Sequence, residues 1–180
     1  MGTKRKKKDI AIKHIISNIY IHKHSNCSNC PIKLYNDESK TIIYGVGNIF
    51  TDTIFVLPTY DVNAKIGYET LLTLLQKQYK ELTNKEVLED CYITRVIKCF
   101  KKTNFDLERS AVKFCIYNLL YEIIRIKPKK VIFLTKDYND IIGFLNQYFT
   151  TNYYQTYNIG VLYYNNEYKD EFIKQLKEII

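Results

Sequence analysis

The strongest constraint on the fold is an alternation of apolar segments rich in β-branched residues with amphipathic segments of helical period. The β-rich segments are short and nearly continuous in apolar character, which is typical of parallel strands buried on both faces. Strands that alternate with helices predict a three-layer α/β domain in which helices cover both faces of a mostly parallel central sheet. The expected strands are Thr41–Tyr44, Thr53–Leu57, Cys91–Ile97 and Val131–Thr135, with a weaker pair at Tyr153–Tyr157 and Gly160–Tyr164; the expected helices are Gly67–Glu81, Leu107–Ile126, Asp137–Tyr148 and Glu167–Ile180.

Three strand ends are the expected places for a binding or catalytic site. Ligands of open parallel sheets bind outside the carboxyl ends of the strands, so the segments after Leu57, Ile97 and Thr135 should carry the chemistry. Gly45 and Gly47 do not form a dinucleotide-binding fingerprint, because the third glycine and the following helix are missing. We expect these two glycines to form a turn between strands.

The length of 180 residues suits one globular domain. Residues 1–8 are expected to form a flexible basic tail and residues 9–180 a single domain, which begins with an amphipathic helix from Asp9 to about Tyr20. No apolar run reaches the ~18 residues of a membrane span. Polar residues interrupt the first apolar stretch, which excludes a secretory signal peptide. We therefore expect the cytoplasm of a bacterium or of a phage-infected cell.

The charge balance favours a polyanionic partner. Lys and Arg outnumber Asp and Glu by 27 to 19, which gives a net charge of +8. The 17 tyrosines are accompanied by much Lys, Ile and Asn, a composition typical of AT-rich coding sequences such as those of low-GC bacteria and their phages. The cations of the tail are suited to docking phosphates; they are Lys4, Arg5, Lys6, Lys7 and Lys8.

Five cysteines without a secretory signal indicate metal or cluster ligation more than disulfides. Cys27 and Cys30 have a two-residue spacing that holds one edge of a metal site, while Cys99 ends an expected strand and Cys115 lies on the next helix. Four thiolates in this arrangement suit a four-iron cluster or a structural zinc ion; the alternative is that they are small buried core residues. Cys91 is expected in the core. His22 and His24 are expected at a solvated helix end, with help to a metal site as the alternative.

Several segments, in order and at similar spacing, resemble the iron–sulfur uracil-DNA glycosylases of the family-four and family-five type. They are Cys27-Ser-Asn-Cys30-Pro31, Gly45-Val46-Gly47-Asn48 before the strand Asp52–Val56, Tyr92-Ile93-Thr94-Arg95-Val96-Ile97-Lys98-Cys99, and Ile126-Lys127-Pro128-Lys129-Lys130-Val131-Ile132. The resemblance spans about residues 26–180. It implies a uracil-DNA glycosylase-like fold and a structural four-iron–four-sulfur cluster that organises loops against DNA. The implied ligands are Cys27, Cys30, Cys99 and Cys115.

The positions that carry chemistry in that family differ here. Pro58 lies where the resemblance places an acidic residue, and a proline cannot activate water. Arg95 lies where it places the asparagine that reads the pyrimidine, and a guanidinium only donates hydrogen bonds. We expect Arg95 to bind a phosphate or to pair with Glu69 or Asp61. Asn165 is the nearest match to the histidine of the last loop, so Asp61 and Asn165 are the remaining catalytic candidates.

A basic turn follows the third expected strand. Its cations and amides suit phosphate contacts, and Phe100 or Phe105 could stack on a base; the alternative is a solvated loop. The aromatic-rich last quarter is interpreted first as core and surface filler and second as a surface for a protein partner. With Arg95, the predicted DNA contacts in and beside this turn are Lys98, Lys101, Lys102 and Asn104.

Three functions follow from these observations. The first is a DNA-binding accessory protein of a phage or mobile element, with an iron–sulfur cluster, an eroded active site and a DNA polymerase or other replication or repair protein as partner. The second is an active glycosylase acting on uracil or another deaminated base. The third is a module that binds only protein. Steep loss of DNA affinity with salt separates the first from the third.

Overall fold

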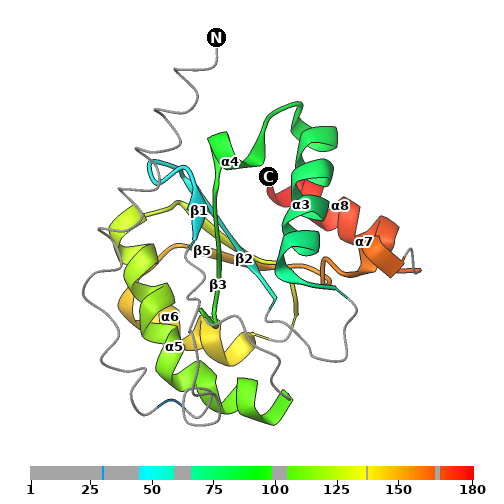
Figure 1. Cartoon of the computed structure of the whole chain (residues 1–180). Coiled ribbons are helices and arrows are strands. Elements are labelled where there is room, and N and C mark those ends of the chain that lie inside the picture. The colour runs from blue at the N-terminus through cyan, green and yellow to red at the C-terminus, as the bar shows by residue number, and fades with distance from the viewer. Residues whose placement is uncertain (1–29, 31–44, 59–65, 99–104, 137, 165–166) are drawn as a thin grey trace, which may run out of the picture.

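The computed structural model describes residue 30 and the segments 45–58, 66–98, 105–136, 138–164 and 167–180. Within these residues the chain is an α/β fold with a five-stranded, mostly parallel mixed sheet flanked by helices (Figure 1). The strand order is β1-β3-β2-β4-β5. β1 is antiparallel to β3, and the other neighbours are parallel. The strands are β1 Val46–Gly47, β2 Thr53–Leu57, β3 Tyr92–Arg95, β4 Lys130–Phe133 and β5 Asn152–Gln155.

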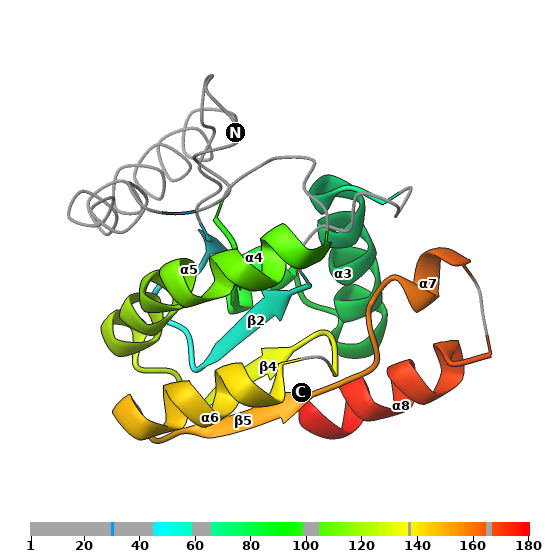
Figure 2. The same ribbon diagram turned by 90° about the horizontal axis from the view of Figure 1, so that it is seen from below.

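Helices pack on both faces of this sheet (Figure 2). α5 and α6 cover one face, where they enclose a core cluster with Val56, Tyr92 and Phe133. α3 and α8 cover the other face, over Phe55 and Leu134. The helices are α3 Tyr68–Thr83, α4 Val87–Asp90, α5 Phe105–Ile126, α6 Asn139–Tyr148, α7 Val161–Tyr164 and α8 Lys169–Ile179.

The sequence accounts for the position of most elements. All five residues of β2 are buried, as expected for a central parallel strand with helices on both sides. α3 buries Leu71, Leu75 and Tyr79 at helical spacing and ends at Asn84, whose positive φ of 58° closes the helix. α5 ends in the same way at Lys127, with φ of 54°, directly before Pro128.

Two local predictions are wrong. Gly160–Tyr164 contains the short helix α7 instead of a strand, because the side chain of Asn158 accepts the amide of Gly160 and turns the chain. Val46–Gly47 is itself strand β1, where a turn was expected. The short helix α4 was not predicted. The predicted strand Thr41–Tyr44 and the N-terminal helix from Asp9 lie outside the described residues.

No helix in the described segments is long and apolar enough to cross a membrane.

Candidate functional site

The candidate site lies at the carboxyl edge of the parallel strands. The chain runs from the central strand β2 to β3 on one side of it. It then crosses from β3 to β4 on the other side of β2, so the direction in which strands are added reverses beside β2. Such a reversal is where open α/β sheets bind ligands. Arg95 is in register with Leu57 at this edge, and the amides of Leu134 and Thr156 continue the ladder on the other side. Pro58, which follows β2 directly, is buried.

A buried carboxylate organises the α5 side of this edge. Glu122 of α5 and Lys98 have side chains that are 0% and 3% exposed and form an ion pair, with 2.6 Å between Lys98 Nζ and Glu122 Oε2. Thr94 donates to the same oxygen at 2.8 Å and also contacts the Lys98 ammonium, while the Tyr92 hydroxyl donates to Glu122 Oε1 at 3.1 Å. The backbone amide of Gly45 donates to the carboxylate as well. Strand β3, helix α5 and the segment before β1 therefore meet at one side chain.

Burial sets the protonation behaviour of this pair. Loss of water raises the pKa of Glu122 well above its usual range, and the Gly45 amide opposes that rise. Burial likewise lowers the pKa of Lys98, although a thiolate at Cys115 would raise it. Neither charge is stable alone at this depth, so each depends on the other. Gly45 makes the arrangement possible, because a β-carbon there would overlap the Tyr92 hydroxyl.

Two of the four predicted metal ligands belong to the same buried region. Cys30 and Cys115 are far apart in sequence, yet both are buried in the core cluster on the α5 side. Cys115 lies two helical turns before Glu122, on the same face of α5, and is close enough to Lys98 to influence its pKa electrostatically. Lys98 directly precedes Cys99 in the chain. The described cysteines are free thiols.

Only two of the four predicted ligands, Cys30 and Cys115, belong to the described residues, and both are buried. Cys27 and Cys99 lie outside the described residues, as do His22 and His24. Within the segments that the structure describes, no three His, Cys, Asp or Glu residues cluster as a metal site.

The fifth cysteine is separated from the others by the sheet. Cys91 is buried in the cluster on the α3 side, whereas Cys30 and Cys115 lie on the α5 side. Its thiol donates to the Tyr79 hydroxyl at 3.4 Å, and burial raises its pKa to about 11. Cys91 is thus a protonated core residue at neutral pH.

Tyr79 also holds the start of β3 through Asp90. The Tyr79 hydroxyl donates to the Asp90 carboxylate, and this bond, with a smaller contribution from Lys85, lowers the pKa of Asp90.

Tyr79→Phe should reduce the free energy of unfolding by about 1–2 kcal/mol at neutral pH, toward the low end because the Asp90 side chain is 37% exposed. A lowered carboxyl pKa contributes stability above about pH 4 that is lost as pH falls through the folded pKa. Urea unfolding at several pH values should therefore show that the difference in free energy of unfolding between wild type and Tyr79→Phe becomes smaller in acid. A difference that does not change with pH would contradict the assigned hydrogen bond between Tyr79 and Asp90.

Two of the predicted DNA contacts, Arg95 and Lys98, are buried. Arg95 is 3% exposed, and its guanidinium lies over the Tyr68 ring with 4.7 Å from Cζ to the ring centroid. Lys98 is equally buried and paired with Glu122. Neither cation is presented to solvent. Arg95 points to the α3 side of the sheet and packs on Tyr68, whereas Lys98 points to α5 and pairs with Glu122. The remaining predicted site residues lie outside the described segments; they are Lys4, Arg5, Lys6, Lys7, Lys8, Lys101, Lys102, Asn104, Asp61 and Asn165.

Sequence reasoning missed Glu122 and Gly45. A signal for Glu122 was present, since it occupies a core position of α5 in a stripe that also includes Cys115 and Leu119. A carboxylate at such a position calls for a buried partner. The importance of Gly45 depends on its approach to Tyr92, which no local pattern reveals.

No protein-family model matches the sequence, and a search of curated proteins finds no significant match.

Proposed function

We propose that this chain is an iron–sulfur-cluster DNA-binding protein with a uracil-DNA glycosylase-like fold and an eroded active site. It would act in the cytoplasm as a replication or repair accessory factor of a phage or mobile element, with a DNA polymerase or another replication protein as partner. The observation that carries the proposal is that Cys30 and Cys115 are both buried on the α5 side of the sheet, where Cys115 acts electrostatically on Lys98, the neighbour of Cys99.

The cluster would be held by Cys27, Cys30, Cys99 and Cys115. Its contribution would be mechanical, because four bonds to metal tie a loop, a strand end and a helix together. The Lys98 ammonium beside Cys115 would be held in place by Glu122 and Thr94. Zinc is the alternative occupant, because tetrahedral thiolate sites accept either metal.

The carboxyl edge supports a binding role over catalysis. A buried proline follows β2 where water activation would require an acid, and Arg95 offers only donors where base recognition would require an amide. With Arg95 and Lys98 buried, phosphate contacts are assigned to the tail cations and to Lys101, Lys102 and Asn104. The net charge of +8 is consistent with that assignment.

Metal content of two serine variants tests the cluster. Cys115→Ser should lose most of the iron and acid-labile sulfide of anaerobically purified protein, because one ligand and its ionised thiolate are removed. Cys91→Ser is the matched control, since it replaces a thiol of similar burial on the opposite side of the sheet. Equal metal content in the two variants, or stoichiometric zinc without sulfide in wild type, would reject an iron–sulfur site.

DNA binding and strand incision separate the three functions. Affinity for DNA should fall with salt at a logarithmic slope of about −0.9 for each phosphate contact on duplex. Neutralising the five tail cations should flatten that slope, whereas neutralising Lys77 and Lys80, which already pair with Glu81 and Glu86, should change it much less per charge removed.

Incision of uracil-containing DNA should be absent. Base release that Asp61→Ala abolishes would establish an active glycosylase instead. Absence of both incision and DNA binding would favour a module that binds only protein.

A further inference from the structure

β5, which forms one edge of the sheet in the described residues, lies in an uncharged stretch of the sequence. From Ile141 to Asn166 the chain contains no Asp, Glu, Lys or Arg, although these make up 26% of the whole sequence. This stretch includes α6 from Ile141 onward, β5 and α7. Its exposed side chains are amides, hydroxyls and tyrosines, including Tyr148, Tyr154 and Tyr163. Interface cores are depleted of charge and enriched in tyrosine in the same way.

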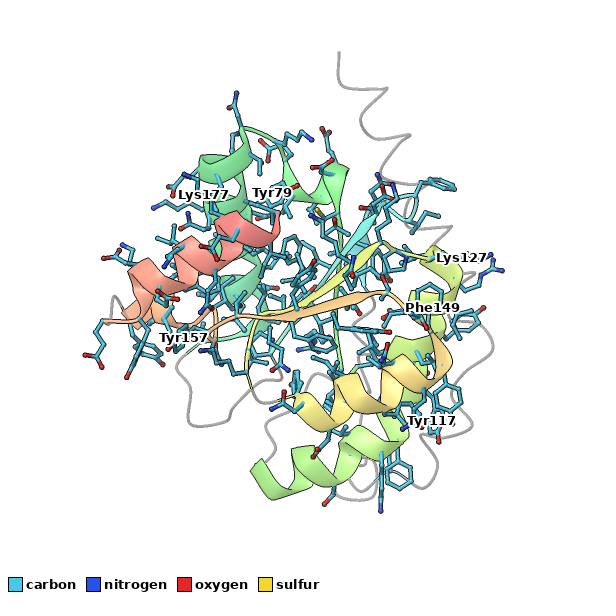
Figure 3. The ribbon with its side chains drawn as sticks, turned by 180° about the vertical axis from the view of Figure 1, so that it is seen from behind. Tyr79, Tyr117, Lys127, Phe149, Tyr157 and Lys177 are labelled. Carbon is cyan, nitrogen blue, oxygen red and sulfur yellow. The ribbon has the colours of Figure 1, made fainter. Side chains whose placement is uncertain are left out.

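β5 offers backbone groups for pairing. It pairs with β4 on one side and is the last strand of the sheet in the described residues (Figure 2). The amides of Asn152 and Thr156 point to β4, so those of Tyr153 and Gln155 point away from it. Beyond the strand, the amide of Tyr157 is already taken by the side chain of Gln175. Phe149 and Tyr157 mark the two ends of β5 in Figure 3.

The usual protections of an edge strand are missing here. Edge strands are commonly guarded by lysine, proline, a bulge or an inward-pointing charge. Residues 150–157, Thr-Thr-Asn-Tyr-Tyr-Gln-Thr-Tyr, contain neither charge nor proline. A hollow of about 300 Å³ beside the strand is lined by Ile142, Asn146 and residues 151–154. The edge is therefore open to another strand and offers room for its side chains.

We infer that β5 pairs antiparallel with β5 of a second copy of this chain, forming a two-fold dimer with a continuous sheet. Two copies that each carry +8 repel one another where their cations meet, and β5, whose own residues carry no charge, is an edge along which they can approach at lower cost. The inference is independent of the proposed function.

The outward backbone groups select a register. Pairing Tyr153 with Gln155 of the second copy, and the reverse, uses the outward amides and carbonyls of both residues. The two-fold axis then passes beside Tyr154, which lies opposite Tyr154 of the second copy in a non-hydrogen-bonded pair. Tyr154 is 36% exposed, so its ring is accessible for that contact. Aromatic cross-strand pairs of this kind stabilise antiparallel strands.

Sedimentation velocity over a concentration series tests the dimer. Wild type should shift from 21.4 kDa to twice that mass as concentration rises. Tyr154→Lys should raise the dimer dissociation constant at least about tenfold, because it places two ammonium groups opposite one another. Tyr163→Lys, at a tyrosine 49% exposed on α7, should leave it unchanged. A protein that stays monomeric at all concentrations would overturn the inference, even if its β5 edge binds another protein. A dimer whose dissociation constant does not change in Tyr154→Lys would overturn it as well.

Cysteine cross-linking tests the register. Tyr154→Cys should form an intermolecular disulfide under mild oxidation, since residues opposed in a non-hydrogen-bonded pair have Cα atoms about 4.5 Å apart. Asn152→Cys, on the same strand, faces residue 156 of the second copy and should cross-link far less. Wild type under the same oxidation corrects for the natural cysteines. Equal cross-linking of the two variants would reject this register.

Discussion

Glu122→Leu should destabilise the fold by about 3–5 kcal/mol, a large fraction of the stability of a domain of this size. The substitution leaves the Lys98 ammonium buried without its counter-charge and removes the acceptor of Thr94, Tyr92 and the Gly45 amide. Urea unfolding at neutral pH measures the loss. Glu81→Leu is the matched control, because that glutamate pairs with Lys77 on the exposed face of α3 at 3.9 Å, and its removal should cost no more than about 0.5 kcal/mol.

The double variant Lys98→Met/Glu122→Leu separates a lost attraction from a stranded charge. Replacing both partners of a buried pair with apolar residues is often nearly neutral, so the double variant should recover most of the loss. Thr94 and Tyr92 would still lack an acceptor, which sets the remaining deficit. A double variant no more stable than Glu122→Leu would show that the stranded ammonium is not the cause.

Gly47→Ala should cost about 3 kcal/mol or more. Gly47 has φ of 106°, which side chains rarely adopt, and a β-carbon there would overlap the backbone carbonyl oxygen of Cys91. Because both obstacles lie in the backbone of the β1–β3 pair, no rotation of a side chain can relieve them. Urea unfolding again provides the measurement.

Gly143→Ala is the opposite case and the control. Gly143 lies inside α6, and a β-carbon there meets nothing within 4 Å. Alanine at an exposed helical position is more favourable than glycine, so this variant should gain about 0.5–1 kcal/mol. If Gly143→Ala lowered the free energy of unfolding as much as Gly47→Ala, the backbone conformation and the close contact at Gly47 would not explain the cost of its substitution.

The sheet and its helices were largely predictable because their signals are local. The buried run Thr53–Leu57 has the continuous apolar character of a central parallel strand, and Lys127-Pro128 ends α5 as the sequence indicates. The failures occur where a distant partner decides. Val46–Gly47 becomes a strand only because β3 lies beside it, and Gly160–Tyr164 turns into a helix under the control of the Asn158 side chain.

The candidate site shows the same division. The position of Cys115 on the helix that follows β3 was predicted, because the helical pattern of that segment is local. The burial of Lys98 did not, because a lysine in a basic segment is ordinarily solvated, and only the carboxylate of Glu122 from another element makes its burial affordable. Arg95 was predicted within the third strand and is the last residue of β3, but the Tyr68 ring that it covers comes from the start of α3.

The strand order has a consequence for synthesis of the chain. β2 is central, yet both strands that flank it, β3 and β4, are translated after it. A nascent chain that ends before Lys130 therefore carries β2, a strand that is buried at every position in the folded protein, with one open edge, and one that ends before Tyr92 carries it with two. Because parallel pairing depends on contacts distant in sequence, this sheet closes only late in translation. Early termination or slow elongation thus leaves β2 unpaired and prone to aggregate before the strands that flank it have been synthesised.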